Sequence, residues 1–289
     1  AQTFWPVTPV NATPASTGWI DVDLDSYVAG LGANVTGVIL HATCITTSSA
    51  FGARKNGGTD NRVSYIAAGY HTWAAIGVDA DHIFEVSLAS LTLQTLWIVG
   101  YTTTGVTFAT NAANKTPGAA LAWTDVDCTD VAAGATALIF ETQETENSLH
   151  AWGIRVNGST DNRTNTSFAH NCFGFIIGNA ADDIFEGYVD STVRLRFWLV
   201  GYCTDGVTMN TNATDISTAT TGSYVDLTAL PATANMGFIE VVADAQRSYA
   251  LRKNGTAEDI YLSLRTHAFA AVECDASQIL EAKISTAGV

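Results

Sequence analysis

The chain has 289 residues, of which 47% are hydrophobic and 14% are charged, and this length suffices for two or three domains with cores of their own. Its 28 acidic and 13 basic residues give a net charge of -15, so DNA or RNA would meet repulsion instead of counterion release. No window holds about 18 uninterrupted apolar residues, so we expect no transmembrane helix. Composition and charge thus exclude nucleic-acid binding and a membrane-spanning role.

The first predicted strand lies within residues 1–16, which we interpret as an N-terminal strand or arm. Phe4, Trp5 and Val7 give this segment an apolar Phe-Trp-x-Val pattern. Pro6 cannot donate a ladder hydrogen bond, so we expect the strand at the edge of a sheet.

Further along the chain, landmarks recur in the same order with a period of about 100 residues, which is the size of a small β-sandwich and too long for a solenoid unit. The segment Trp19–Asp23 returns as Trp123–Asp127 and, in weakened form, as Tyr224–Leu227. The segment Leu96–Tyr101 returns as Phe197–Tyr202. We interpret the chain as three tandem repeats.

Each repeat also carries an Asn-Gly hairpin motif, which is the strongest short-range hairpin signal, and a glutamate further along the chain. Because every copy must fold while catalysis usually needs one site, we interpret the shared Arg and Glu as an ion pair across strands that fixes the hairpin. The repeated positions are Arg54, Asn56, Asp60, Arg62 and Glu85 in the first copy, Arg155, Asn157, Asp161, Arg163 and Glu186 in the second, and Arg252, Asn254 and Glu281 in the third.

Short apolar runs such as Gly37–Thr43 and the period-two alternation at Phe84–Leu88 are typical of strands. No convincing amphipathic helix longer than two turns occurs. We therefore predict an all-β chain of three tandem antiparallel β-sandwich repeats, of the jelly-roll or immunoglobulin-like type. The predicted segments are the N-terminal arm 1–16, repeat 1 at 17–108, a linker at 109–122, repeat 2 at 123–209, a linker at 210–223 and repeat 3 at 224–289.

The third repeat is expected to lack its last strand, because no counterpart of Leu96–Tyr101 follows Ile284. A missing strand would leave core and a sheet edge uncovered. The Phe4-Trp5-x-Val7 pattern resembles the missing motif, and three explanations stay open. The N-terminal strand could close the third repeat of its own chain, it could be donated to a neighbouring chain, or the third repeat could simply be shorter.

The sequence holds no pattern that points to an enzyme or to a cofactor. No GxSxG, P-loop or HExxH motif is present, and the five cysteines include no CxxC pair. Most cysteines are expected to be buried, although a Cys128–Cys203 bridge is an alternative. Asp21, Asp23 and Asp25 alternate along a predicted strand and form a weak calcium candidate, with a solvated strand face as the preferred interpretation. We expect no metal site.

Two tryptophans outside the repeated landmarks suggest a second kind of function. Trp73 and Trp152 do not clearly repeat, so we expect them on loops or strand ends. An exposed indole can stack on a sugar ring and donate a hydrogen bond. They are therefore candidate glycan contacts.

The stretch Arg54–Arg62 and its copy ending Asn157–Arg163 resemble β-rich repeats of tailed-phage virion proteins. The resemblance covers two repeats well and the third in part, since the third reads Ala257-Glu258-Asp259. It implies a structural role in a particle, as a decoration, tail or fibre protein, and it carries over no catalytic residue.

We therefore expect a non-enzymatic structural protein of a virion or an extracellular filament. Its partners would be further copies of itself or other virion proteins, and assembly would use β-strand and aromatic contacts, with donation of the N-terminal strand as one route. The alternative is a carbohydrate-binding adhesin or receptor-binding module.

Overall fold

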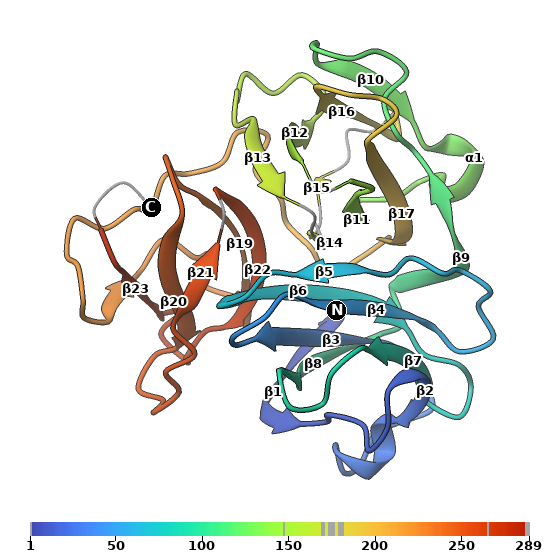
Figure 1. Cartoon of the computed structure of the whole chain (residues 1–289), viewed down its shortest axis with the longest axis vertical. Helices are drawn as coiled ribbons and strands as arrows, with labels where there is room; N and C mark the ends of the chain where they lie inside the picture. Colours follow the sequence, from blue (N-terminus) through green and yellow to red (C-terminus); the bar gives the residue numbers. More distant parts are fainter. Residues whose placement is uncertain are drawn as a thin grey trace.

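The computed structural model describes residues 2–146, 148–168, 171–172, 177–178, 182–264 and 266–286. The regular secondary structure of these residues is almost entirely β-strand, with one short α-helix, α1 (Thr129–Ala132), and one 3-10 turn at Leu24–Ser26 (Figure 1). The predicted all-β sandwich class is confirmed. Within the described ranges, no helix is long and apolar enough to cross a membrane.

The first repeat is a sandwich of two four-stranded sheets with the strand orders β1-β8-β3-β6 and β2-β7-β4-β5. Eight antiparallel strands that alternate between two sheets in this order form a jelly roll, and the immunoglobulin-like alternative does not apply to this repeat. The strands are β1 (Phe4–Asn11), β2 (Gly18–Asp23), β3 (Val35–Cys44), β4 (Ser49–Lys55), β5 (Ser64–Ile66), β6 (Tyr70–Gly77), β7 (Ile83–Leu88) and β8 (Gln94–Thr103).

The second repeat has the same pairing order, β9-β17-β11-β14 and β10-β16-β12-β13, with β15 also paired to β11. The predicted linker 109–122 is wrong in its first part, because residues 109–114 belong to β9, which pairs with β17. The strands are β9 (Val106–Asn114), β10 (Thr124–Asp127), β11 (Ala137–Glu144), β12 (Leu149–Val156), β13 (Asn165–Phe168), β14 (Asn171–Cys172), β15 (Ile177–Gly178), β16 (Ile184–Val189) and β17 (Leu195–Cys203).

In the part of the third repeat that the structure describes, one sheet has four strands, β18-β23-β20-β21, and a second sheet has two, β19 and β22. Among the described residues, no strand pairs with the other edge of β19, where β8 pairs with β3 in the first repeat. A single parallel bridge between Ser263 and Tyr70 joins the four-stranded sheet to β6. The strands are β18 (Val225–Leu227), β19 (Met236–Val242), β20 (Arg247–Lys253), β21 (Leu262–Leu264), β22 (His267–Glu273) and β23 (Leu280–Ile284).

The N-terminal strand belongs to the first repeat. Phe4 and Trp5 of β1 lie opposite Thr102 and Tyr101 of β8, and Val7 lies in the irregular part of the ladder between Pro6 and Val10. The explanation in which this strand closes the third repeat of its own chain is therefore wrong, since β1 forms its ladder with β8 and none with β19. As Pro6 predicts, β1 is an edge strand.

The three repeats surround a common centre, with the blue, green and orange parts of the ribbon in Figure 1 forming three lobes. One cluster of buried apolar side chains draws on all of them, for example Trp73, Trp152 and Tyr249. Although β1 is part of the first lobe, it also contacts the third, where the Phe4 ring meets the Phe238 ring edge-on at 5.1 Å. Burial between lobes thus makes one packed body of three sandwiches.

Because the neighbouring side chains of Phe4 and Trp5 on β1 are buried and exposed respectively, we expect their truncation to lower the free energy of unfolding by different amounts. Phe4→Ala removes a ring that is 3% exposed, and we expect the free energy of unfolding to fall by about 3–5 kcal/mol because a cavity forms between the first and third repeats. Trp5→Ala is the control, since this ring is 38% exposed and is expected to cost about 1 kcal/mol. Urea unfolding measures both, and equal losses would contradict the assigned orientation of β1.

Candidate functional site at the interfaces between repeats

The repeated arginine and glutamate lie directly opposite each other on neighbouring strands in all three repeats. Arg54 donates to Glu85 through Nε at 2.9 Å and through Nη2 at 2.8 Å, and its guanidinium lies 4.1 Å from the Trp19 ring centroid. The other two sets are Arg155, Glu186 and Trp123 in the second repeat, and Arg252, Glu281 and Tyr224 in the third. These groups have structural partners throughout, in agreement with the ion-pair interpretation.

The hairpin loops are held in the same way in each repeat. The Asn56 amide donates to Asp79, Asn157 donates to Asp182, and Asn254 donates to Asp275. The third loop, despite its different sequence, keeps the hydrogen bond from the repeated arginine to a loop carbonyl, here Arg252 to Glu258. The equivalent acceptors are the carbonyls of Asp60 and Asp161. Positions can therefore be compared one by one between the loops.

At the end of the first two loops, an arginine reaches into the following repeat. Arg62 Nε lies 2.7 Å from Glu141 of the second repeat and also pairs with Asp60. Burial raises the pKa of Glu141 to about 7, and the nearby Arg62 offsets only part of that effect. The first two repeats are thus joined through a buried ion pair.

The second and third repeats are joined by the same device. Arg163 Nε lies 2.6 Å from Glu240, which also contacts Nε2 of His267 at 2.6 Å. Burial pushes the pKa of Glu240 up, but His267 and Arg163 outweigh it and hold the pKa below its usual value. The Trp152 ring stacks on His267 with a centroid separation of 4.3 Å.

The interface between the third and first repeats has the same aromatic contact, but among the described residues no ion pair crosses it. Tyr249 meets His71 at a centroid distance of 4.4 Å, as Trp152 meets His267. His41 occupies the position of Glu240, because each lies opposite the aromatic residue of the neighbouring strand, Trp73 or Phe269. In place of an arginine, the third loop has Ile260, eight positions after its repeated arginine.

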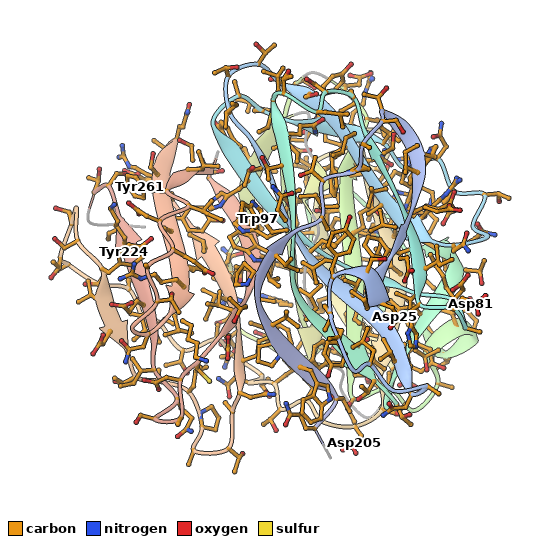
Figure 2. The ribbon with its side chains drawn as sticks, turned by 90° about the horizontal axis from the view of Figure 1, so that it is seen from below. Asp25, Asp81, Trp97, Asp205, Tyr224 and Tyr261 are labelled. Carbon is orange, nitrogen blue, oxygen red and sulfur yellow. The ribbon has the colours of Figure 1, made fainter. Side chains whose placement is uncertain are left out.

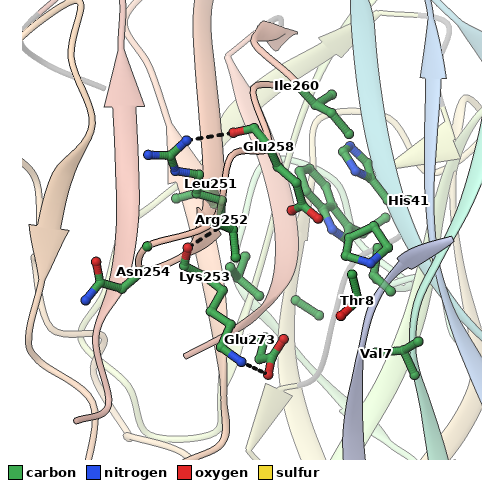
Figure 3. A pocket seen from close by; sticks show the side chains of 17 residues that line it. Val7, Thr8, His41, Leu251, Arg252, Lys253, Asn254, Glu258, Ile260 and Glu273 are labelled. Carbon is green, nitrogen blue, oxygen red and sulfur yellow. Dashed lines mark hydrogen bonds and ion pairs between the residues drawn. The ribbon is translucent and has the colours of Figure 1, made fainter. Parts of the chain in front are cut away.

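A cavity of about 310 Å³ lies at this third interface (Figure 3). Its walls come from residues 7–9 of β1, from β3 and β6 of the first repeat, and from the hairpin loop and β22 of the third. Side chains of His41, Trp73, Glu258, Ile260 and Glu273 line it. The cavity thus lies where the two other interfaces are filled by an arginine.

The two candidate glycan contacts are buried, so that prediction is wrong in its premise of exposed rings. Trp73 is 3% exposed and stacks on His41, with 3.9 Å between the ring centroids. Trp152 is fully buried against His267 and Phe269. The sequence showed no repetition at these positions because the pseudo-equivalent residues, such as Tyr249 for Trp152, differ in type.

The three aspartates of the calcium candidate have separate roles. Asp21 lies on β2 opposite Glu85, and Asp23 accepts a hydrogen bond from the Asp25 backbone N–H. Asp25 lies on the outer surface and contacts His82 at 3.1 Å (Figure 2). In the part of the chain that the structure describes, no group of three or more His, Cys, Asp or Glu side chains could hold a metal ion.

The cysteines are buried free thiols at the four described positions, Cys44, Cys128, Cys203 and Cys274. The alternative of a Cys128–Cys203 bridge is therefore wrong. Burial raises the pKa of both thiols to about 12, which keeps them protonated and unreactive at neutral pH. The side chain of Cys172 lies outside the described residues.

Comparison with protein-family models, with curated proteins and with solved structures finds no match. The resemblance to phage virion repeats therefore stays a prediction.

Because the ion pair between the first two repeats is buried, we expect truncation of its arginine to lower the free energy of unfolding strongly. Arg62→Met leaves Glu141 buried without its partner, and we expect the free energy of unfolding to fall by about 3–5 kcal/mol. Arg194→Met is the matched control, because Arg194 pairs with Glu146 at the surface and should cost less than about 1 kcal/mol. Urea unfolding at pH 7.5 measures both. A loss at Arg62 as small as that of the control would overturn its role at the interface.

The neutral histidine pair at the third interface predicts acid sensitivity. Burial lowers the pKa of His41 from 6.5 to about 3, and its Nε2 lies 3.0 Å from Nδ1 of His71, whose pKa is lowered too. Below pH 6.5 the His41 ring binds a proton in the unfolded chain but stays neutral in the folded chain. The free energy of unfolding therefore falls as the pH decreases from 6.5 towards 3.

The test compares wild type with His41→Gln at pH 7.5 and pH 5.0 by urea unfolding. We expect the variant to lose about 1–2 kcal/mol less than wild type over this range, because one such proton uptake has been removed. The same pH dependence in wild type and His41→Gln would contradict the assignment.

Proposed function

We propose that the protein is a non-enzymatic structural component of a virion or an extracellular filament, and that it assembles by accepting a β-strand at the edge of β19. One observation carries the proposal. Two jelly rolls have complete sheets, whereas the third has a two-stranded sheet with one edge of β19 unpaired among the described residues. An unpaired edge is a template for strand addition.

The complete repeats define the strand that the edge accepts. In the first repeat β8 lies between β1 and β3, and its residues Leu96 and Ile98 are buried while Trp97 between them is half-buried. In the second repeat β17 takes the same place between β9 and β11. The partner strand therefore carries apolar side chains at alternate positions.

A glycine is a second feature of that strand. A Cβ on Gly100 would lie 2.8 Å from the carbonyl oxygen of Trp5, and a Cβ on Gly201 would lie 2.6 Å from that of Thr107. Both contacts are with backbone of the first strand of the repeat, which cannot give way cheaply. We expect a glycine at the equivalent place of the incoming strand.

The third repeat also retains a segment that resembles the first strand of the other repeats. Residues 206–208 read Gly-Val-Thr, as do residues 105–107 at the start of β9. Asn212 accepts a hydrogen bond from the Thr160 backbone N–H, as Asn111 accepts one from Thr59. No ladder forms along the described residues 207–213, which is consistent with the absence of the strand that would lie between them and β19.

The incoming strand is proposed to come from another polypeptide of the particle and not from β1. Phe4, Trp5 and Val7 already lie in the first repeat of their own chain, so donating them would uncover β8 in the donor. Jelly rolls occur in viral capsid and lectin domains, and the fold supports the virion role by analogy alone. The glycan-binding alternative loses support because Trp73 and Trp152 are both buried.

The test uses a synthetic peptide with the β8 sequence Gln94–Thr103. We expect the peptide to bind the intact chain and to raise its melting temperature, because it completes the sheet of the third repeat. A peptide of the same composition in scrambled order is the control for nonspecific hydrophobic binding. Isothermal titration calorimetry and differential scanning calorimetry give the two readouts.

A variant that fills the edge from its own chain sharpens the test. The sequence Gln94–Thr103 is appended after Val289, and this variant should melt at a higher temperature than wild type and should not bind the peptide. Negative-stain microscopy of wild type with and without the peptide then follows assembly, which the peptide should inhibit. Failure of the peptide to bind, or equal binding to wild type and to the extended variant, would overturn the proposal.

A further inference from the structure

The cavity at the third interface has no part in strand addition, and its chemistry points to a ligand. We propose that it binds an alkylguanidinium group, supplied by a small molecule or by an arginine side chain of a partner. Because β19 lies elsewhere in the third repeat and does not line the cavity, this inference is independent of the proposed assembly role.

The two other interfaces show what such a site holds. Arg62 and Arg163 each place a guanidinium between an acidic residue of the loop, Asp60 or Asp161, and a glutamate of the next repeat. In the third loop Glu258 stands at the position of Asp60 and Asp161, since all three carbonyls accept from the repeated arginine. Ile260 occupies the position in the third loop that Arg62 and Arg163 occupy in the other two.

Glu258 is consequently a carboxylate without the arginine that its equivalents have. The structure gives no hydrogen bond to its side chain from a described residue, and Figure 3 shows it among the side chains that line the cavity, as His41 does. Burial, and then the negative charge of Glu273, raises its pKa above the usual value. A cation in the cavity would stabilise the ionised Glu258 carboxylate against both its burial and the negative charge of Glu273.

The other charges around the cavity are already paired. Lys253 Nζ lies 2.5 Å from Glu273, and the Arg252 guanidinium is bound to Glu281 and stacked over Tyr224. The pKa of His41 is lowered to about 3 by burial, so this ring is neutral at pH 7 and would not repel a cation. One carboxylate is left in excess, and the site selects a single positive charge.

The shape of the site favours a guanidinium over an ammonium group. The stacked rings of His41 and Trp73 line one side of the cavity, and a planar guanidinium can stack on an aromatic face while its N–H groups reach a carboxylate in fork geometry. The volume of about 310 Å³ lies at the small end of the range of about 300–1,000 Å³ for small-molecule sites. A short alkylguanidinium is therefore of suitable size.

The experiment measures the binding of propylguanidinium, of butylammonium and of arginine capped as the N-acetyl N-methylamide to the full chain by NMR titration at pH 7.5. We expect propylguanidinium to bind at least tenfold more tightly than butylammonium. Tighter binding of the capped arginine than of propylguanidinium would identify a protein side chain as the source, and the reverse order would identify a free small molecule. Equal affinity for the guanidinium and the ammonium probe would overturn the proposal.

Variants separate the site from the general negative charge of the protein. Glu258→Gln keeps the shape of the side chain and should weaken guanidinium binding at least tenfold, whereas Asp81→Asn removes one charge at an exposed position and should leave binding unchanged. Ile260→Arg should fill the cavity, abolish binding and raise the melting temperature. Wild-type binding in Glu258→Gln would overturn the proposal whether or not Ile260→Arg folds.

Discussion

A guanidinium held by one carboxylate and one aromatic ring is the interaction on which the rest of the molecule depends. Arg54, with Glu85 and Trp19, fixes the first hairpin loop, and the same trio recurs in the two other repeats. Because the loop is held at its base, the residues at its far end have a defined position. Arg62 and Arg163 lie there and contact the neighbouring repeat, so the loop that each hairpin motif forms also joins two repeats.

The ring of repeats is closed by burial and not by exchange of a strand. Each interface sets an aromatic residue of one repeat against a histidine of the next where both are described, as Trp152 does with His267 and Tyr249 with His71. Two interfaces add a buried ion pair, which is costly to break once one partner is removed. The third replaces both charges together, with His41 for the glutamate and Ile260 for the arginine, so that no buried glutamate is left opposite Ile260 without its arginine.

The departures from threefold regularity that bear on function fall in or beside the third repeat. Its second sheet has two strands among the described residues, its loop has Ile260 in place of the arginine, and a cavity lies between it and the first repeat. Positions that keep the pattern in all three copies serve folding, since each sandwich needs them. Positions that break the pattern in one copy are free of that requirement, and both proposals therefore concern the third repeat.

The sequence by itself determined the features that depend on neighbouring residues. The Asn-Gly hairpins and the all-β class could be predicted because turn chemistry and strand alternation are local. The period and the pairing of Arg54 with Glu85 could be predicted because the same residues recur in order along the sequence. Only the tertiary structure decided how distant segments meet. It placed residues 109–114 in β9, β1 beside β8, and Trp73 and Trp152 in the core. It also placed Glu258 and His41 on the walls of one cavity. Such contacts join residues far apart in the chain, and their register is set by the packing of whole sheets, which no local pattern records.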